Sequence, residues 1–165
     1  MTTTGPFHPL SDDTRHRLLH GGLDPDAVAA LVRAAIAEDL MGGIDVTSVA
    51  TVPATQRSVG TFASRGHGVV AGLAVAAAAI EALCGAAACA VEYLVTDGAR
   101  VAPGDAVARV TAPTRALLTA ERTALNLLCH LSGVATLTRR WADALEGTGC
   151  VVRDTRKTTP GLRAL

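Results

Sequence analysis

The chain has 165 residues, of which 49% are hydrophobic, and its 15 basic and 15 acidic residues balance to a formal net charge of zero. This composition is typical of a globular protein and excludes an intrinsically disordered chain. The balanced charge also predicts no long basic surface for nucleic acid, so a site for an anion must be local.

The four cysteines lack C-x-x-C spacing, and the opening residues, MTTTGPFHPLSDD, lack the basic and then apolar pattern of a signal peptide. We therefore expect a reducing, cytoplasmic location. Residues 69–91 are long enough for a membrane span, but they are mostly alanine, contain Glu81 and are interrupted by Gly72 and Gly85. We interpret this stretch as a strand followed by a buried helix and expect no contact with a membrane.

Residues 1–24 are polar and irregular, and we interpret them as an N-terminal tail with a short helix at 12–20. The first clear helix begins after Asp24, the predicted N-cap, with Pro25 at the first helical position. Its apolar i, i+3, i+4 stripe ends near Leu40, and two glycines follow as a stop signal.

Residues 44–113 form short apolar runs separated by turn residues such as DG at 97 and PGD at 103, which favour tight reversals. The predicted fold of residues 25–116 is therefore a compact α+β domain, an antiparallel sheet with helices. Four strands are predicted at 57–63, 67–71, 90–96 and 106–111, and one helix at about 73–84.

Residues 117–145 are the longest segment with helical periodicity, with Thr119 as the predicted N-cap and Glu121 in the first turn. Gly133 weakens the middle, so a kinked helix and two helices are both open.

The apolar run at 150–152 predicts a strand that leads into a polar, cationic loop. A helix followed by such a strand is typical of the start of an α/β barrel. We therefore predict that residues 117–165 begin a second domain.

That loop, RDTRKTTPGLR at 153–163, combines four basic residues with one acid and three threonines, and Lys157 is the only lysine in the chain. Arginine offers a planar fork for carboxylate or phosphate, while lysine is a compact and mobile charge. The segment is thus a candidate anion clamp; the alternative is a solvated chain end without a role.

Arg122 is a second candidate. A cation in the first turn of a helix is electrostatically unfavourable, so we expect an anionic partner elsewhere in the structure. From spacing alone, a surface arginine paired with Glu121 or Glu92 is an equally good interpretation.

The stretch AEDLMGGIDVTS at 37–48 holds three acids, which could bind a metal. Its two glycines and D-x-T pattern are what a helix stop and a turn require, so we favour a structural role for Glu38, Asp39 and Asp45.

Several familiar sites are excluded. GHGVVAG at 66–72 lacks the dinucleotide-binding spacing, and the sole lysine is preceded by arginine, so there is no P-loop. Residues 95–110 resemble the hairpins of biotinyl and lipoyl carrier domains but lack their lysine. His67 and His130 stand apart from other ligand types and receive no role.

Together, AEDLMGGIDVTS, the PGD turn, LLTAERTALNLLCHLSGVATLTRR and RDTRKTTPGLRAL resemble the quinolinate phosphoribosyltransferase family, from about residue 25 to the end. The resemblance implies an N-terminal α+β domain followed by the first helix and strand of a truncated α/β barrel. It also implies a homodimer or higher homo-oligomer, in which one subunit's N-terminal region closes the other's barrel. Because members of the family continue through the barrel, we expect this piece alone to be inactive.

The implied reaction joins quinolinate to phosphoribosyl pyrophosphate with Mg²⁺, giving nicotinate mononucleotide, carbon dioxide and pyrophosphate in NAD biosynthesis. Arg156 and Lys157 match the family's substrate-binding pair, with Lys157 also as the catalytic residue, and Thr155 matches a neighbouring pocket position. Arg122 matches the arginine given across the dimer to the dicarboxylate. The Mg²⁺ ligands are expected in the rest of the barrel.

A pair of adjacent carboxylates and a set of phosphates require several fixed cations, which agrees with these residues. Two alternatives stay open: a related barrel phosphoribosyltransferase with another base, such as the homologue associated with molybdate transport, and a non-enzymatic interaction module.

Overall fold

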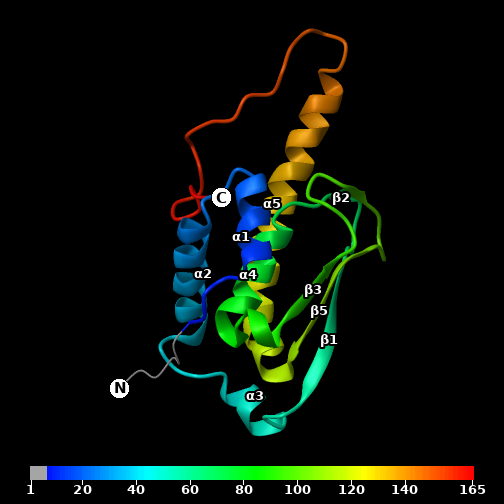
Figure 1. The fold of residues 1–165 in the computed structure, drawn as a ribbon. Coiled ribbons are helices and arrows are strands. Elements are labelled where there is room, and N and C mark those ends of the chain that lie inside the picture. The colour runs from blue at the N-terminus through cyan, green and yellow to red at the C-terminus, as the bar shows by residue number, and fades with distance from the viewer. Residues whose placement is uncertain (1–6) are drawn as a thin grey trace.

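The computed structural model describes residues 7–165, which form helices on one side of a small antiparallel sheet (Figure 1). Helix α4 (Leu73–Cys84) lies in the middle, in contact with α1 (Asp12–His20), α2 (Pro25–Leu40), strand β5 (Ala106–Pro113) and α5 (Thr114–Ala144). The predicted α+β fold is confirmed, and the described residues contain no closed barrel.

The first two helices begin at side-chain caps. Ser11 accepts a hydrogen bond from the Thr14 backbone N–H at the start of α1, and Asp24 accepts one from Asp26 N–H at 2.9 Å at the start of α2. The predicted limits of α2 are confirmed. It ends at Leu40 because the next residue, Met41, adopts a left-handed conformation with φ 48°.

A short helix that the sequence analysis did not predict follows, α3 (Val46–Thr51), with Asp45 as its N-cap. The D-x-T pattern, interpreted as a turn, therefore starts a helix. Its six residues are too few to show an amphipathic period.

Helix α4 has the predicted limits of 73 and 84 and is buried along nearly its whole length. Its first N–H groups are satisfied from a distant turn, because Asp97 accepts hydrogen bonds from Gly72 N–H at 3.0 Å and Leu73 N–H at 3.1 Å. Gly72 has φ 96°, which only glycine adopts readily, and a methyl group there would lie 2.5 Å from Leu131 of α5. A short 3₁₀ turn, η1 (Ala86–Ala88), follows the helix.

The sheet has the order β1-β5-β3, with β1 (Arg57–Ala63) and β3 (Ala90–Tyr93) both antiparallel to β5. The strand predicted at 57–63 is confirmed in full. The strands predicted at 67–71 and 90–96 are shorter than expected. The first is reduced to β2 (Gly68–Val69), because it pairs only with β4 (Arg100–Val101), a two-residue strand that was not predicted. The second is β3, which ends at Tyr93.

Helix α5 begins directly after β5, with Pro113 at its cap position, and runs for 31 residues. The predicted N-cap role of Thr119 is therefore wrong, and Glu121 and Arg122 do not lie in the first turn. The helix also continues without interruption through Gly133, which removes the two-helix alternative.

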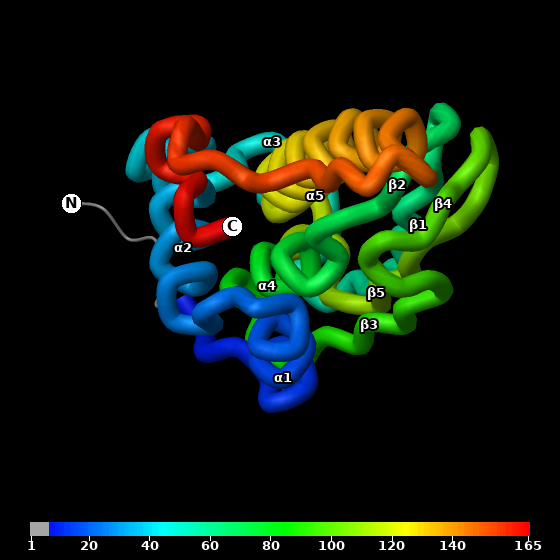
Figure 2. Tube along the Cα trace, turned by 90° about the horizontal axis from the view of Figure 1, so that it is seen from above, coloured from blue at the N-terminus to red at the C-terminus, as the bar shows by residue number. Residues whose placement is uncertain are grey.

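Residues 146–165 contain no strand, so the strand predicted at 150–152 is also wrong. A strand requires a neighbour for its backbone hydrogen bonds, and Val151 and Val152 have none; they are 67% and 39% exposed. The segment returns from the end of α5 toward α1 and α2 (Figure 2), where Leu162 and Leu165 pack on the core. No helix within residues 7–165 is both long enough and apolar enough to cross a membrane.

Candidate active site

Arg122 projects from α5 with 76% of its side chain exposed, and its Nε lies 3.4 Å from Oδ1 of Asp39 near the end of α2. The expected anionic partner is thus Asp39. Glu92 instead pairs with Arg109 across two strands. Such a surface ion pair contributes little stability, but it fixes one side of the guanidinium. Among the described residues nothing is hydrogen-bonded to its two terminal nitrogens, which leaves the fork free for an anion.

Asp45 lies beside this pair. Its carboxylate accepts hydrogen bonds from the N–H of Ser48 at 3.0 Å and the hydroxyl of Ser48 at 2.5 Å. The Thr119 hydroxyl lies 3.1 Å from Asp45 Oδ2 and 2.8 Å from the Arg115 carbonyl. The hydrogen bonds from Ser48 hold the pKa of Asp45 below its ordinary value, and the charge of Arg122 acts in the same direction.

Arg115 joins α3 to α5 from the other end. Its Nε donates to the carbonyl of Val52 at 2.8 Å and its Nη2 to the carbonyl of Val49 at 3.0 Å, so it satisfies carbonyls at the end of α3. With Asp45 at the start of α3, this contact holds the α2–α3 connection against the part of α5 that carries Arg122. The structural role predicted for the acids of 37–48 is confirmed for Asp45, and Asp39 additionally anchors Arg122.

The second set of predicted residues is exposed and carries no such anchor. Thr155, Arg156 and Lys157 lie in a segment without regular structure, where Lys157 donates its backbone N–H to the Thr155 hydroxyl at 3.3 Å. Within residues 7–165 no hydrogen bond or ion pair joins this set to Arg122. The end of the segment meets the α1–α2 turn, where Leu165 lies beside Gly21 and Leu23, whereas Asp39 lies at the opposite end of α2 (Figure 1).

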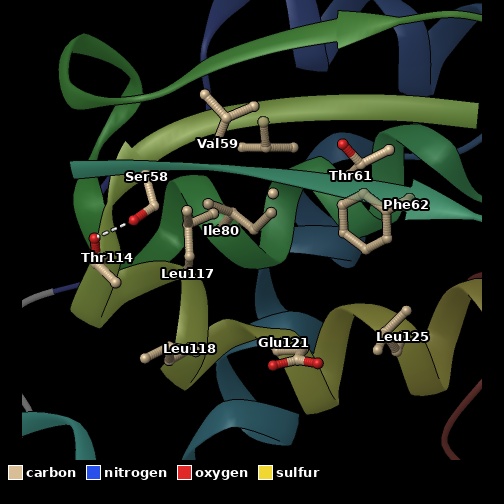
Figure 3. A pocket seen from close by; sticks show the side chains of 12 residues that line it. Ser58, Val59, Thr61, Phe62, Ile80, Thr114, Leu117, Leu118, Glu121 and Leu125 are labelled. Carbon is tan, nitrogen blue, oxygen red and sulfur yellow. Dashed lines mark hydrogen bonds between the residues drawn. The ribbon is translucent and has the colours of Figure 1, made fainter. Parts of the chain in front are cut away.

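A groove also runs along α5. Two adjoining cavities of about 330 and 820 Å³ run between α5 and the β1–β2 region and share Thr61, Phe62, Glu121 and Leu125. Glu121 and Leu125 lie across the first cavity from the strand residues (Figure 3). Leu118, Leu125 and Cys129, which line these cavities, lie four, three and seven residues from Arg122 and therefore on the same side of the helix. The groove combines apolar walls with the basic side chains of Arg65 and Arg140 and the acid Glu121.

Metal ligation has no support in this part of the molecule. Within residues 7–165 no group of three histidine, cysteine or acidic side chains could hold a metal ion, and Asp39 and Asp45 are engaged with protein partners.

The last helix of this α+β domain presents Arg122, whose guanidinium is held by Asp39 and whose terminal nitrogens are free within the described residues. A segment with Arg156 and Lys157 follows the helix. These features are typical of an enzyme domain that binds small anions. Comparison with known proteins specifies the class further. The chain belongs to the quinolinate phosphoribosyl transferase family: the pattern of the family's N-terminal domain matches residues 45–132, more than half of the chain, and that of its C-terminal domain matches 134–165. The two patterns meet inside α5.

The chain is 49% identical to the nicotinate-nucleotide pyrophosphorylase [carboxylating] of Mycobacterium leprae over 85% of its own length and 49% of that protein. It is 36% identical to the chloroplastic enzyme of the same name from Oryza sativa, over 81% of the chain and 35% of that protein. The crystal structure of NadC from Streptococcus pyogenes superposes with a TM-score of 0.79 at 34% identity, covering 86% of this chain and 49% of that one. This chain therefore spans about half or less of the length of these relatives.

Arg122 could be identified from the sequence, but the residues that hold it could not. Asp39 was noted only as one of three clustered acids, and Arg115 was not noted at all. Both contacts join residues more than 60 positions apart in the chain, so neither leaves a local spacing signal.

Proposed function

We propose that this chain forms part of an enzyme that transfers a phosphoribosyl group from phosphoribosyl pyrophosphate to quinolinate, with loss of carbon dioxide, to give nicotinate mononucleotide for NAD biosynthesis. Membership of the family and the printed names of the relatives support this reaction. The observation that carries it is the fork of Arg122, which is held at Nε by Asp39 and has both terminal nitrogens free to bind a carboxylate.

The roles follow from charge and position. Arg122 binds a carboxylate of quinolinate through its two terminal nitrogens. Arg156 and Lys157 supply further positive charge for the substrates, and Thr155 offers a hydroxyl beside them. When carbon dioxide leaves, an electron pair stays on the ring carbon, and fixed cations around the ring stabilise that charge.

A homodimer is part of the proposal. Among the described residues no hydrogen bond or ion pair joins Arg122 to the 155–157 set; Arg122 pairs with Asp39 near the end of α2, whereas the segment that follows the set reaches the α1–α2 turn at Leu165. This separation favours a site in which Arg122 comes from one subunit and Lys157 from the other. Exposed apolar side chains along α5, namely Leu118, Val134, Leu137 and Trp141, are available for contact with a second chain.

Mg²⁺ and the location are also part of the proposal. Mg²⁺ is proposed from the family resemblance, and its ligands are expected outside residues 7–165, which contain no group of three ligand side chains. A cytoplasmic location is proposed because all four cysteines are free thiols. The names of the relatives favour quinolinate over another base and an enzyme over a non-enzymatic interaction module.

The test is a chimera in which this chain replaces the stretch of the M. leprae relative that it matches, assayed for release of labelled carbon dioxide from carboxyl-labelled quinolinate. We expect release that depends on phosphoribosyl pyrophosphate and is lost in Arg122→Ala. Arg139→Ala is the matched control, because Arg139 lies on the same helix and pairs only with Asp143 among the described residues. A folded chimera that is inactive while the relative is active, or equal losses in both variants, would contradict the proposal.

A further inference from the structure

We propose that Cys84 and Cys89 form a thiol-modification site, which reacts with a low-molecular-weight disulfide and closes into an intramolecular disulfide. The site lies at the end of α4, away from Arg122 and from the 155–157 segment. It does not depend on the proposed function.

The chain path brings the two thiols together. Cys84 is the last residue of α4, and Gly85 then turns the chain with φ 75°. The 3₁₀ turn η1 completes the reversal. In it the Ala88 N–H donates to the Gly85 carbonyl at 3.1 Å and the Cys89 N–H donates to the Ala86 carbonyl at 3.2 Å. The reversal returns Cys89 to the end of α4, where each thiol is near enough to the other to shift its pKa.

Both thiols are partly exposed and pack against the same apolar cluster of Ile80, Val110 and Ala120. The same cluster therefore positions both thiols, and both remain accessible to a small reagent. The Cys84 thiol also donates to the carbonyl of Ile80 at 3.3 Å, which fixes its position one turn back along the helix.

The surroundings assign different roles to the two sulfurs. A hydrogen bond from Cys89 lowers the pKa of Cys84, and the positive charge of Arg57 contributes in the same direction; burial and Glu81 oppose it, as do the carbonyls at the end of α4. The pKa of Cys89 is raised, chiefly by its hydrogen bond to Cys84 and by burial. Arg57 is held in place by donating from Nη2 to the Ala88 carbonyl at 2.9 Å.

Cys84 is thus the attacking thiolate and Cys89 the resolving thiol. The Cys84 thiolate attacks one sulfur of the small disulfide, which breaks its S–S bond, forms a mixed disulfide and releases one thiolate. Cys89 then gives up its proton to that thiolate or to water and attacks the Cys84 sulfur, which expels the second small thiol. In total, two protein thiols are oxidised and one small disulfide is reduced to two thiols.

The other two cysteines provide an internal contrast. Cys129 and Cys150 are exposed, and within residues 7–165 neither is hydrogen-bonded to another thiol. Each can form a mixed disulfide, but neither has a resolving partner. The same reagent should therefore add one of its two thiol halves at each of these two positions and remove two hydrogens at the proposed site.

The test is incubation of the chain with oxidised glutathione under native conditions, followed by alkylation of the remaining thiols and peptide mapping by mass spectrometry. We expect a Cys84–Cys89 cross-link that forms before half of the Cys129 or Cys150 thiol is consumed. In Cys89→Ser we expect a stable glutathione adduct at Cys84, while Cys84→Ser should slow the reaction of Cys89 at least tenfold.

The parent chain alone decides the question if a variant fails to fold. Adducts on both Cys84 and Cys89 without a cross-link would overturn the proposal. So would two unreacted thiols after Cys129 and Cys150 have been fully modified.

Discussion

Arg122 and Lys157 are both exposed cations, but they are held in different ways. Arg122 is anchored by Asp39 at 3.4 Å, whereas the only hydrogen bond of Lys157 within the described residues is made by its backbone N–H. The first is therefore positioned before any ligand arrives, and the second is free to move toward one. Their difference leads to separate predictions at the scale of single residues.

Lys157→Ala, made in the chimera described above, should lower turnover by about 100-fold or more, because a cation near the reacting groups is lost. Its free energy of unfolding should change by less than about 0.5 kcal/mol, since the side chain is exposed. Steady-state kinetics and a thermal melt of the same preparation measure both. Unchanged turnover would remove Lys157 from the site.

Asp45 should make stability depend on pH. Its pKa is lowered in the folded chain from 3.8, so the ionised form stabilises the fold above the unfolded value, and this contribution disappears as the pH falls through the folded pKa. Asp45→Asn keeps an N-cap but loses the charge. We expect the parent to be more stable than Asp45→Asn by roughly 0.5–1 kcal/mol at pH 7.

The same comparison near pH 2 should show no difference between parent and Asp45→Asn. Urea melts at several pH values measure the trend. Asp154→Asn is the control, because Asp154 is exposed and makes no ion pair or hydrogen bond in the part of the chain that the structure describes. A difference in free energy of unfolding between the parent and Asp45→Asn that grows as the pH falls would contradict the prediction.

At the scale of elements, α3 depends on α5 more than on its own six residues. Arg115→Ala removes two hydrogen bonds that the end of α3 receives, and we expect the free energy of unfolding to fall by roughly 1–2 kcal/mol, with faster amide exchange at 46–51. Arg140→Ala, on the same helix and without a hydrogen bond or ion pair in the described region, should leave both unchanged. Unaltered exchange in Arg115→Ala would show that α3 is held by other contacts.

The elements that could be predicted from the sequence are those with local signals at both ends. Helix α2 has Asp24 and Pro25 at its start, and α4 lies between Gly72 and Gly85; both have their predicted limits. The start of α5 was missed because β5 runs into it at Pro113 without a polar cap, so the apolar pattern alone placed the start too late.

The remaining differences depend on contacts that sequence patterns do not encode. Strand β4 is two residues long and exists because it pairs with β2. Residues 150–152 have the composition of a strand but pair with no strand among the described residues, and they are exposed. For the candidate site, family motifs identified Arg122, while its anchor Asp39 emerged only when α2 and α5 were seen packed together.

At the scale of the whole molecule, the two sets of cations are kept apart. Arg122 faces the α2–α3 side, and the segment with Thr155, Arg156 and Lys157 returns toward the α1–α2 turn (Figure 1). This separation is the reason for proposing a site that is shared between two copies. The proposed function requires a second copy to bring Arg122 to the partner's Lys157.

Subunit mixing tests this central claim most directly. Chimeras carrying Arg122→Ala and Lys157→Ala are prepared separately, mixed under conditions that exchange subunits, and assayed for carbon dioxide release after mass spectrometry confirms hybrid dimers. In a hybrid, one site combines both defects and the other is intact, so we expect partial activity, up to half that of the unmodified chimera per hybrid dimer. Verified hybrids as inactive as either parent would show that Arg122 does not act on the partner's site.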